Sequence, residues 1–148
     1  VVYEVGNDEM FAAFEEEEAT LNGKPISVSE RTKMEEAFLA TGFPYYDYQK
    51  LKGYMEALAE FMRTTTGLRR LGSAATDLAY VACGRFDGFF EYSLSPWDVA
   101  AGAFIVQQAG GYVQDFKAKD NYIYGKEIIA SNPHLAKEIQ QTLAENFV

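Results

Sequence analysis

The first 28 residues alternate short apolar runs with turn-forming residues. Three such runs, separated by Gly-Asn-Asp and by four consecutive glutamates, are Val1–Val5, Met10–Phe14 and Ala19–Leu21. They are followed by Asn22-Gly23, a pair that tolerates the positive φ angles of a two-residue hairpin turn. The pattern predicts an antiparallel β meander over residues 1–28.

From residue 37 onward the pattern changes to alternating strands and helices. Short apolar runs predict strands at 37–43, 86–92, 112–115 and 128–131. Helical spacing of apolar residues and N-terminal capping residues predict helices at 48–63, 73–85, 95–109 and 132–147. In the third helix, the side chains expected to face inward are Ala100, Phe104, Ile105 and Ala109. The alternation predicts an α/β fold, a layered mixed sheet flanked by helices and preceded by the antiparallel β meander.

The amino-acid composition of the chain excludes several classes of protein and of binding partner. The 148 residues are 48% hydrophobic, which is enough to bury a sizeable core. A net charge of −9 argues against the basic surface that nucleic acid requires, so we expect no nucleic-acid partner. No apolar run is long enough to span a bilayer, and the first residues lack the pattern of a signal peptide. Because Cys83 is the only cysteine, an internal disulfide is excluded, and we predict a cytoplasmic protein without a membrane partner.

Candidate chemistry lies at the ends of three predicted elements. The small residues of Gly72-Ser73-Ala74 open a helix, where backbone N–H groups bind a hydroxyl or an anion unless the segment serves only close helix packing. Glu91 lies at the end of a predicted strand. Its carboxylate is either solvated or serves as a ligand for a metal ion or for substrate hydroxyls. Asp98 lies in the first turn after Pro96, where a carboxylate caps the helix or binds a hard cation such as Mg²⁺. One aspartate cannot complete the octahedral shell of that ion.

The residues of these segments, and their spacing along the chain, are similar to those of a known family. The strings concerned are Gly72-Ser73-Ala74-Ala75, Asp87-Gly88-Phe89-Phe90-Glu91, Trp97-Asp98-Val99-Ala100-Ala101-Gly102 and Ala109-Gly110-Gly111. In them the chain closely resembles the inositol monophosphatase family, for which Trp-Asp-x-Ala-Ala-Gly is a specific signature. The resemblance extends over nearly the whole chain but corresponds only to the second half of the family's pattern.

The resemblance implies a function and roles for individual residues. Members of the family are Mg²⁺-dependent phosphomonoesterases, in which carboxylates hold metal ions that polarise the phosphate and activate a water. By position, Asp98 would be a metal ligand and Glu91 an acceptor for a substrate hydroxyl, while Gly72, Ser73 and Ala74 would line the inositol pocket. The implied substrate is a small-molecule phosphomonoester of the myo-inositol monophosphate type, with fructose 1,6-bisphosphate or adenosine 3′,5′-bisphosphate as alternatives. The implied oligomeric state is a homodimer.

The departures from the family pattern matter as much as the match. No Asp-Pro-x-Asp-Gly-Thr metal motif occurs, and Asp87-Gly88 corresponds to a structural segment to which we assign no metal role. We therefore expect the C-terminal portion of a longer phosphatase, inactive alone, whose N-terminal half is missing. Residues 1–28 would belong to the sheet of that missing half, with apolar side chains left exposed, and residues 29–148 would form the substrate-binding domain. The alternative is a non-catalytic oligomerisation or protein-binding module.

Overall fold

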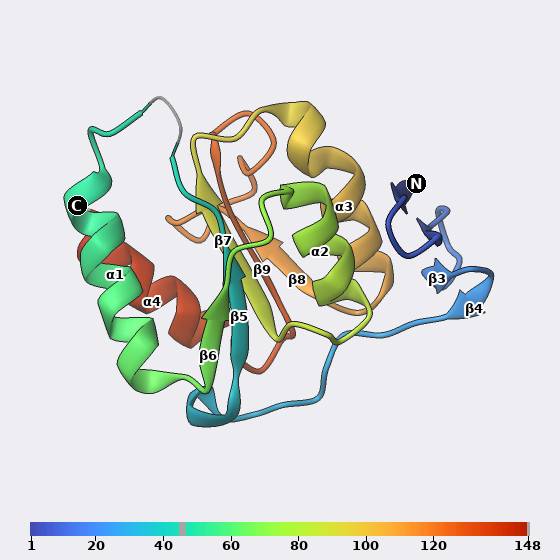
Figure 1. The fold of residues 1–148 in the computed structure, drawn as a ribbon, viewed down its shortest axis with the longest axis horizontal. Coiled ribbons are helices and arrows are strands. Elements are labelled where there is room, and N and C mark those ends of the chain that lie inside the picture. Colours follow the sequence, from blue (N-terminus) through green and yellow to red (C-terminus); the bar gives the residue numbers. More distant parts are fainter. Residues whose placement is uncertain (45–46, 148) are drawn as a thin grey trace.

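Two β-sheets and four α-helices form the framework of residues 1–44 and 47–147, which the computed structural model describes (Figure 1). The first sheet is antiparallel, and its strands in order are β1 (Val2–Glu4), β2 (Glu9–Ala12), β3 (Thr20–Leu21) and β4 (Lys24–Pro25). This arrangement confirms the predicted meander.

The hairpin between β3 and β4 follows from its two central residues. Asn22 and Gly23 adopt φ angles of 49° and 76°, the left-handed conformation that a two-residue turn of this kind needs. The Asn22 side chain also accepts a hydrogen bond from Met10 N at 2.8 Å and donates one to Asp8 O at 3.1 Å. The asparagine therefore stabilises both its own turn and the neighbouring strand β2.

The second sheet has five strands and is mixed, as predicted. In spatial order they are β6 (Gly67–Arg69), β5 (Phe38–Thr41), β7 (Gly88–Tyr92), β9 (Glu127–Ser131) and β8 (Tyr112–Gln114). The pairs β5–β6 and β5–β7 are parallel, whereas β7–β9 and β8–β9 are antiparallel. Strand β6 was not predicted, because three residues without alternation give no periodic signal.

Helices cover both faces of the five-stranded sheet (Figure 1). They are α1 (Leu51–Thr64), α2 (Ala74–Ala82), α3 (Pro96–Gln108) and α4 (Ala136–Asn146), and a short 3₁₀-helix, η1 (Met34–Glu36), precedes β5. Consecutive residues of β7 point to opposite faces: Phe89 packs with α2 and α3, and Phe90 with α1 and α4. Val2 and Phe11 of the first sheet join the core on the α2–α3 side.

Close approach of α2 and α3 explains one residue of the Trp-Asp-x-Ala-Ala-Gly signature. A Cβ atom on Gly102 would lie 2.6 Å from Leu78 Cβ, a distance that packed side chains do not tolerate. The glycine therefore allows α3 to lie directly against α2. This contact sets the relative position of the two helix N-termini.

The predicted inward face of α3 is wrong in part. Ile105 and Ala109 are buried as expected, but Ala100 and Phe104 are exposed, and Val99 and Ala103 occupy the core instead. Helix α3 is apolar on nearly all sides, so its periodicity does not distinguish the buried face. Tertiary packing against α2 decides it.

Some large apolar side chains face solvent, and two groups of them stand out. In and beside the first sheet they are Val1, Tyr3, Val5 and Met10, which agrees in part with the exposure expected there, since Val2 and Phe11 are buried. On α1 they are Leu51, Met55 and Met62, while Tyr54, Ala57 and Phe61 form the buried face. In the part of the chain that the structure describes, no helix has the length and apolarity to cross a membrane.

A buried carboxylate joins the segment between the two sheets to the five-stranded sheet. Asp87 is 3% exposed and accepts hydrogen bonds from Ser29 Oγ at 2.6 Å, Phe38 N at 2.7 Å and Arg31 Nε at 3.2 Å. Three chain segments thus converge on one side chain. This placement agrees with the structural role expected for Asp87.

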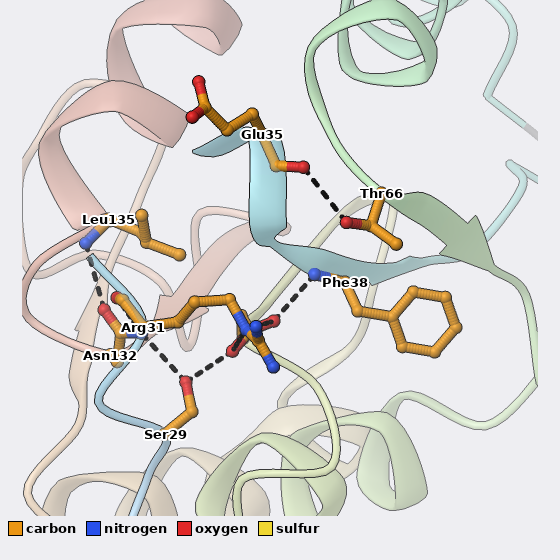
Figure 2. Close-up of polar contacts among 8 residues, drawn as sticks. Ser29, Arg31, Glu35, Phe38, Thr66, Asn132 and Leu135 are labelled. Carbon is orange, nitrogen blue, oxygen red and sulfur yellow. Dashed lines mark hydrogen bonds and ion pairs between the residues drawn. The ribbon is translucent and has the colours of Figure 1, made fainter. Parts of the chain in front are cut away.

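The same junction continues to the start of α4 (Figure 2). Asn132 is fully buried; its Nδ2 donates to Ser29 Oγ at 2.9 Å and to Arg31 O at 3.0 Å. Its Oδ1 accepts a hydrogen bond from Leu135 N at 3.0 Å, which satisfies an N–H at the helix start. We call Ser29, Arg31, Asp87 and Asn132 the polar junction.

Candidate functional site

A pocket of about 420 Å³ lies at the carboxyl ends of the parallel strands β5 and β7, next to the N-termini of α2 and α3. Ligands of open α/β sheets bind in the crevice outside the carboxyl ends of the strands, and this volume suits a small molecule. The lining residues are Gly42, Phe43, Pro44, Arg70, Gly72, Ser73, Ala74, Ala75, Glu91, Tyr92, Ser93, Leu94, Ser95, Trp97 and Asp98.

All five residues singled out from the sequence line this pocket. Gly72, Ser73 and Ala74 approach it from the start of α2, Glu91 from β7 and Asp98 from the start of α3. They come from three segments of the chain that the fold brings to one edge of the sheet. Their chemical roles stay predictions.

Both helix N-termini at the pocket are capped by side chains that also line it. Ser73 Oγ accepts a hydrogen bond from Thr76 N at 3.4 Å. In α3, Asp98 Oδ2 accepts a hydrogen bond from Ser95 N at 2.9 Å, so capping accounts for one carboxylate oxygen. Among the described residues the structure shows no hydrogen bond to Asp98 Oδ1, the other oxygen of this pocket-lining carboxylate.

Glu91 occupies the space that a side chain at position 42 would fill. A Cβ atom on Gly42 would lie 2.1 Å from the Glu91 carboxyl group, so a side chain at position 42 would force this carboxyl group to move. Tyr54 Oη donates to Gly42 O at 2.9 Å, and Thr41 Oγ1 donates to Phe90 O at 2.7 Å. These bonds hold the end of β5 in place beneath the carboxyl group.

The electrostatics of the pocket favour a proton on Glu91. Burial raises the pKa of Glu91 to about 8, and the nearby Asp77 and Asp98 carboxyls add to the rise while Arg70 opposes it. Burial also raises the pKa of Asp77 to about 7, again against the effect of Arg70. Glu91 and Asp98 line the pocket together with Arg70, and the burial of Glu91 favours its neutral form.

Sequence reasoning missed several residues of this region. Arg70 lines the pocket, and its guanidinium carbon lies 5.3 Å from the centre of the Phe43 ring. Trp97 is 82% exposed at the pocket, beside Asp98. A basic residue two positions before Gly72 was a usable signal for Arg70, whereas nothing local distinguishes Gly42 from an ordinary strand-end glycine.

The described residues do not form a complete Mg²⁺ site. Among residues 1–44 and 47–147, no group of three or more His, Cys, Asp or Glu side chains is placed to hold a metal ion. Mg²⁺ takes six oxygen ligands in octahedral geometry and prefers carboxylates and phosphate oxygens. Asp98 Oδ1 suits such an ion chemically, but the remaining ligands would have to come from elsewhere.

Comparison with known proteins agrees with the family resemblance of the sequence. A family model described as the inositol monophosphatase family matches residues 1–148. Nus factor SuhB of Escherichia coli K12 is 43% identical over 147 residues, covering 99% of this chain and 55% of the relative. Nus factor SuhB of Pseudomonas aeruginosa is 42% identical over 145 residues, covering 97% of this chain and 54% of the relative.

Solved structures agree in fold. The extragenic suppressor protein suhB of Bartonella henselae superposes with a TM-score of 0.90 at 40% identity, covering 95% of this chain and 54% of that one. An inositol monophosphatase from Anabaena also gives a TM-score of 0.90, at 35% identity, covering 97% of this chain and 57% of that one. The chain spans about half the length of the curated relatives it matches. With its whole length matched, the chain belongs to the inositol monophosphatase family.

Proposed function

We propose that this chain is the substrate-binding side of a Mg²⁺-dependent phosphomonoesterase that acts on a polyol phosphate of the myo-inositol monophosphate type. The observation that carries the proposal is the convergence of Gly72, Ser73, Ala74, Glu91 and Asp98 on one pocket. Membership of the inositol monophosphatase family supports it. Fructose 1,6-bisphosphate and adenosine 3′,5′-bisphosphate are the alternative substrates.

Each side chain would contribute a different interaction. Glu91 would hydrogen-bond a ring hydroxyl, and the N–H groups around Gly72 to Ala74 would contact the polyol at the positive end of α2. Asp98 would supply one oxygen to a Mg²⁺ whose other ligands lie outside this chain. When bound, Mg²⁺ polarises the phosphate and lowers the pKa of a water.

Ligand binding to the chain itself tests the proposed roles. In ¹⁵N NMR titrations with myo-inositol 1-phosphate, we expect the amides of Gly72, Ser73 and Ala74 to shift, with millimolar affinity because most metal ligands are absent. Gly42→Ala should displace the Glu91 carboxyl group and weaken binding about three- to tenfold, the value of one hydrogen bond.

The control for this titration is an exposed glycine far from the pocket. Gly23→Ala strains the β3–β4 turn, because residue 23 has a φ angle of 76°, but this turn does not line the pocket, so the ligand affinity should be unchanged. Ligand-induced shifts confined to residues outside the pocket would contradict the assigned roles. A stronger response to fructose 1,6-bisphosphate would change the proposed substrate.

A second candidate is a non-catalytic oligomerisation or protein-binding module. The exposed apolar side chains of the first sheet and of α1 favour it, and so do relatives named Nus factor SuhB. Under this candidate, the complete gene product that contains residues 1–148 would self-associate through these side chains and hydrolyse no phosphomonoester. The first candidate requires hydrolysis by the same product.

A further inference from the structure

The chain leaves strand β7 through a β-bulge at the pocket. Two consecutive N–H groups, those of Ser93 and Leu94, donate to the carbonyl oxygen of Lys126 at 2.6 Å and 3.3 Å. Two residues therefore oppose one residue of the neighbouring strand, which is the hydrogen-bond pattern of a bulge. Both residues of this bulge line the pocket, and in the sequence they lie between Glu91 and Asp98.

The first residue of the bulge, Ser93, has a strained backbone. Its φ angle of 69° lies in the left-handed region. Glycine normally occupies this position of such a bulge, because a Cβ atom in the left-handed conformation crowds the following carbonyl oxygen. Serine therefore makes the backbone at position 93 less stable than glycine would. Backbone strain of this kind clusters at ligand-binding sites.

The position of Ser93 distinguishes it from the other left-handed residues. Five other non-glycine residues in the part of the chain that the structure describes have a positive φ angle, and they are Asp8, Glu16, Asn22, Ala118 and Lys126. All five are exposed, and none of them lines the pocket. Ser93 is half-buried and lines it. A surface turn explains the other five, whereas Ser93 is strained at the site itself.

The Ser93 hydroxyl does not contribute to holding the bulge. Backbone N–H groups make both hydrogen bonds to Lys126 O. Across residues 1–44 and 47–147, the structure shows no hydrogen bond to Ser93 Oγ. The fold therefore uses the backbone of this residue and leaves its side chain without a structural role.

We infer that Ser93 is a specificity-determining residue, whose hydroxyl hydrogen-bonds a ring hydroxyl of the substrate in the pocket that Glu91 also lines. The inference rests on the proposed function for the identity of the substrate. A serine hydroxyl both donates and accepts hydrogen bonds, as a polyol hydroxyl does, so the two groups are complementary. A site that hydrogen-bonds a substrate hydroxyl discriminates against phosphomonoesters that lack this hydroxyl.

Two substitutions separate the hydroxyl from the backbone strain. Ser93→Ala removes only the hydroxyl, whereas Ser93→Gly removes the hydroxyl and the strain. In ¹⁵N NMR titrations, each should weaken the binding of myo-inositol 1-phosphate about three- to tenfold, the value of one hydrogen bond. Neither should change the binding of methyl phosphate, which has no ring hydroxyl. Only Ser93→Gly should raise the midpoint of urea unfolding, by about 0.2 to 0.5 M.

Ala118→Gly is the matched control. Ala118 has a φ angle of 58°, is exposed and does not line the pocket. Glycine at this position should also raise the midpoint of urea unfolding, because it relieves the same kind of strain, and should leave the affinity for both phosphates unchanged.

The results that would contradict the inference differ from those that would contradict the proposed function. An unchanged affinity for myo-inositol 1-phosphate in Ser93→Ala would overturn the role of Ser93 and leave the proposed function standing. Equal weakening for both phosphates would also overturn this role, since the loss would not depend on ring hydroxyls. A wild type without preference for myo-inositol 1-phosphate over methyl phosphate would remove the proposed substrate, and the role of Ser93 with it.

Discussion

Replacing Asp87 by alanine is expected to lower the free energy of unfolding by about 3 kcal/mol. The carboxylate is buried and accepts hydrogen bonds from Ser29 Oγ, Phe38 N and Arg31 Nε. Without it, the first two donors stay partly buried with a lost partner, which is costlier than the loss of the bonds alone. Arg31 is half exposed and can be hydrated, which limits the total.

Urea unfolding monitored by circular dichroism measures this effect. Asp87→Asn preserves shape and one acceptor oxygen, so its loss of stability should be smaller. Asp120→Ala serves as the matched control, because Asp120 is exposed and should change the free energy of unfolding by less than about 0.5 kcal/mol. A loss below about 1 kcal/mol for Asp87→Ala would mean that the polar junction does not hold the linking segment to the sheet.

The free energy of unfolding is also expected to fall by several kcal/mol, at most about 7 kcal/mol, between pH 5 and pH 9. Folding raises the pKa of Glu91 from 4.5 to about 8 and that of Asp77 from 3.8 to about 7. Between these values the folded chain keeps protons that the unfolded chain has lost. The stability associated with the two groups is therefore complete below the unfolded pKa and is lost as the pH rises through 7 to 8.

Chemical unfolding at a series of pH values tests this dependence. Glu91→Gln and Asp77→Asn should each flatten the profile, since each removes one of the groups that gains a proton on folding. Glu138→Gln, in an exposed position, should leave the profile as in the wild type. A stability that is constant or increases from pH 5 to pH 9 would contradict the assignment of raised pKa values.

Local chemistry made several elements predictable. Asn22-Gly23 determined a hairpin because few residues adopt its φ angles, and Ser73 marked the start of α2 because its hydroxyl caps the helix. The burial of Leu78 and Val81 on α2 was also predictable from their helical spacing, whereas the burial of Asp77 on the same helix was not. These signals depend on a few neighbouring residues.

The elements and residues that were missed depend on contacts distant in the sequence. Strand β6 is only three residues long, and its pairing with β5 defines it. Gly42 leaves room for the observed position of the Glu91 carboxyl group, and Glu91 lies on another strand. Asp77 was overlooked because its importance comes from burial without a partner, a property that the tertiary structure alone determines.

The resemblance to a family assigned residues to one site, which the spacing of residues along the chain could not do. It assigned Gly72 to Ala74, Glu91 and Asp98 to one site before any geometry was known, and the fold places them around one pocket. From the residues alone, capping or packing was a sufficient explanation, and capping does account for one oxygen of Asp98. The other oxygen is the one that the proposed metal role requires.

Phosphate release by the complete gene product that contains residues 1–148 tests the central claim most directly. With Mg²⁺ and myo-inositol 1-phosphate, we predict hydrolysis by the wild type and a loss of about 100-fold or more in Asp98→Asn, because a metal ligand contributes several kcal/mol to the transition state. Asparagine still caps α3, so the fold should persist. Wild-type rates in Asp98→Asn, with Asp120→Asn as the exposed control, would contradict the account.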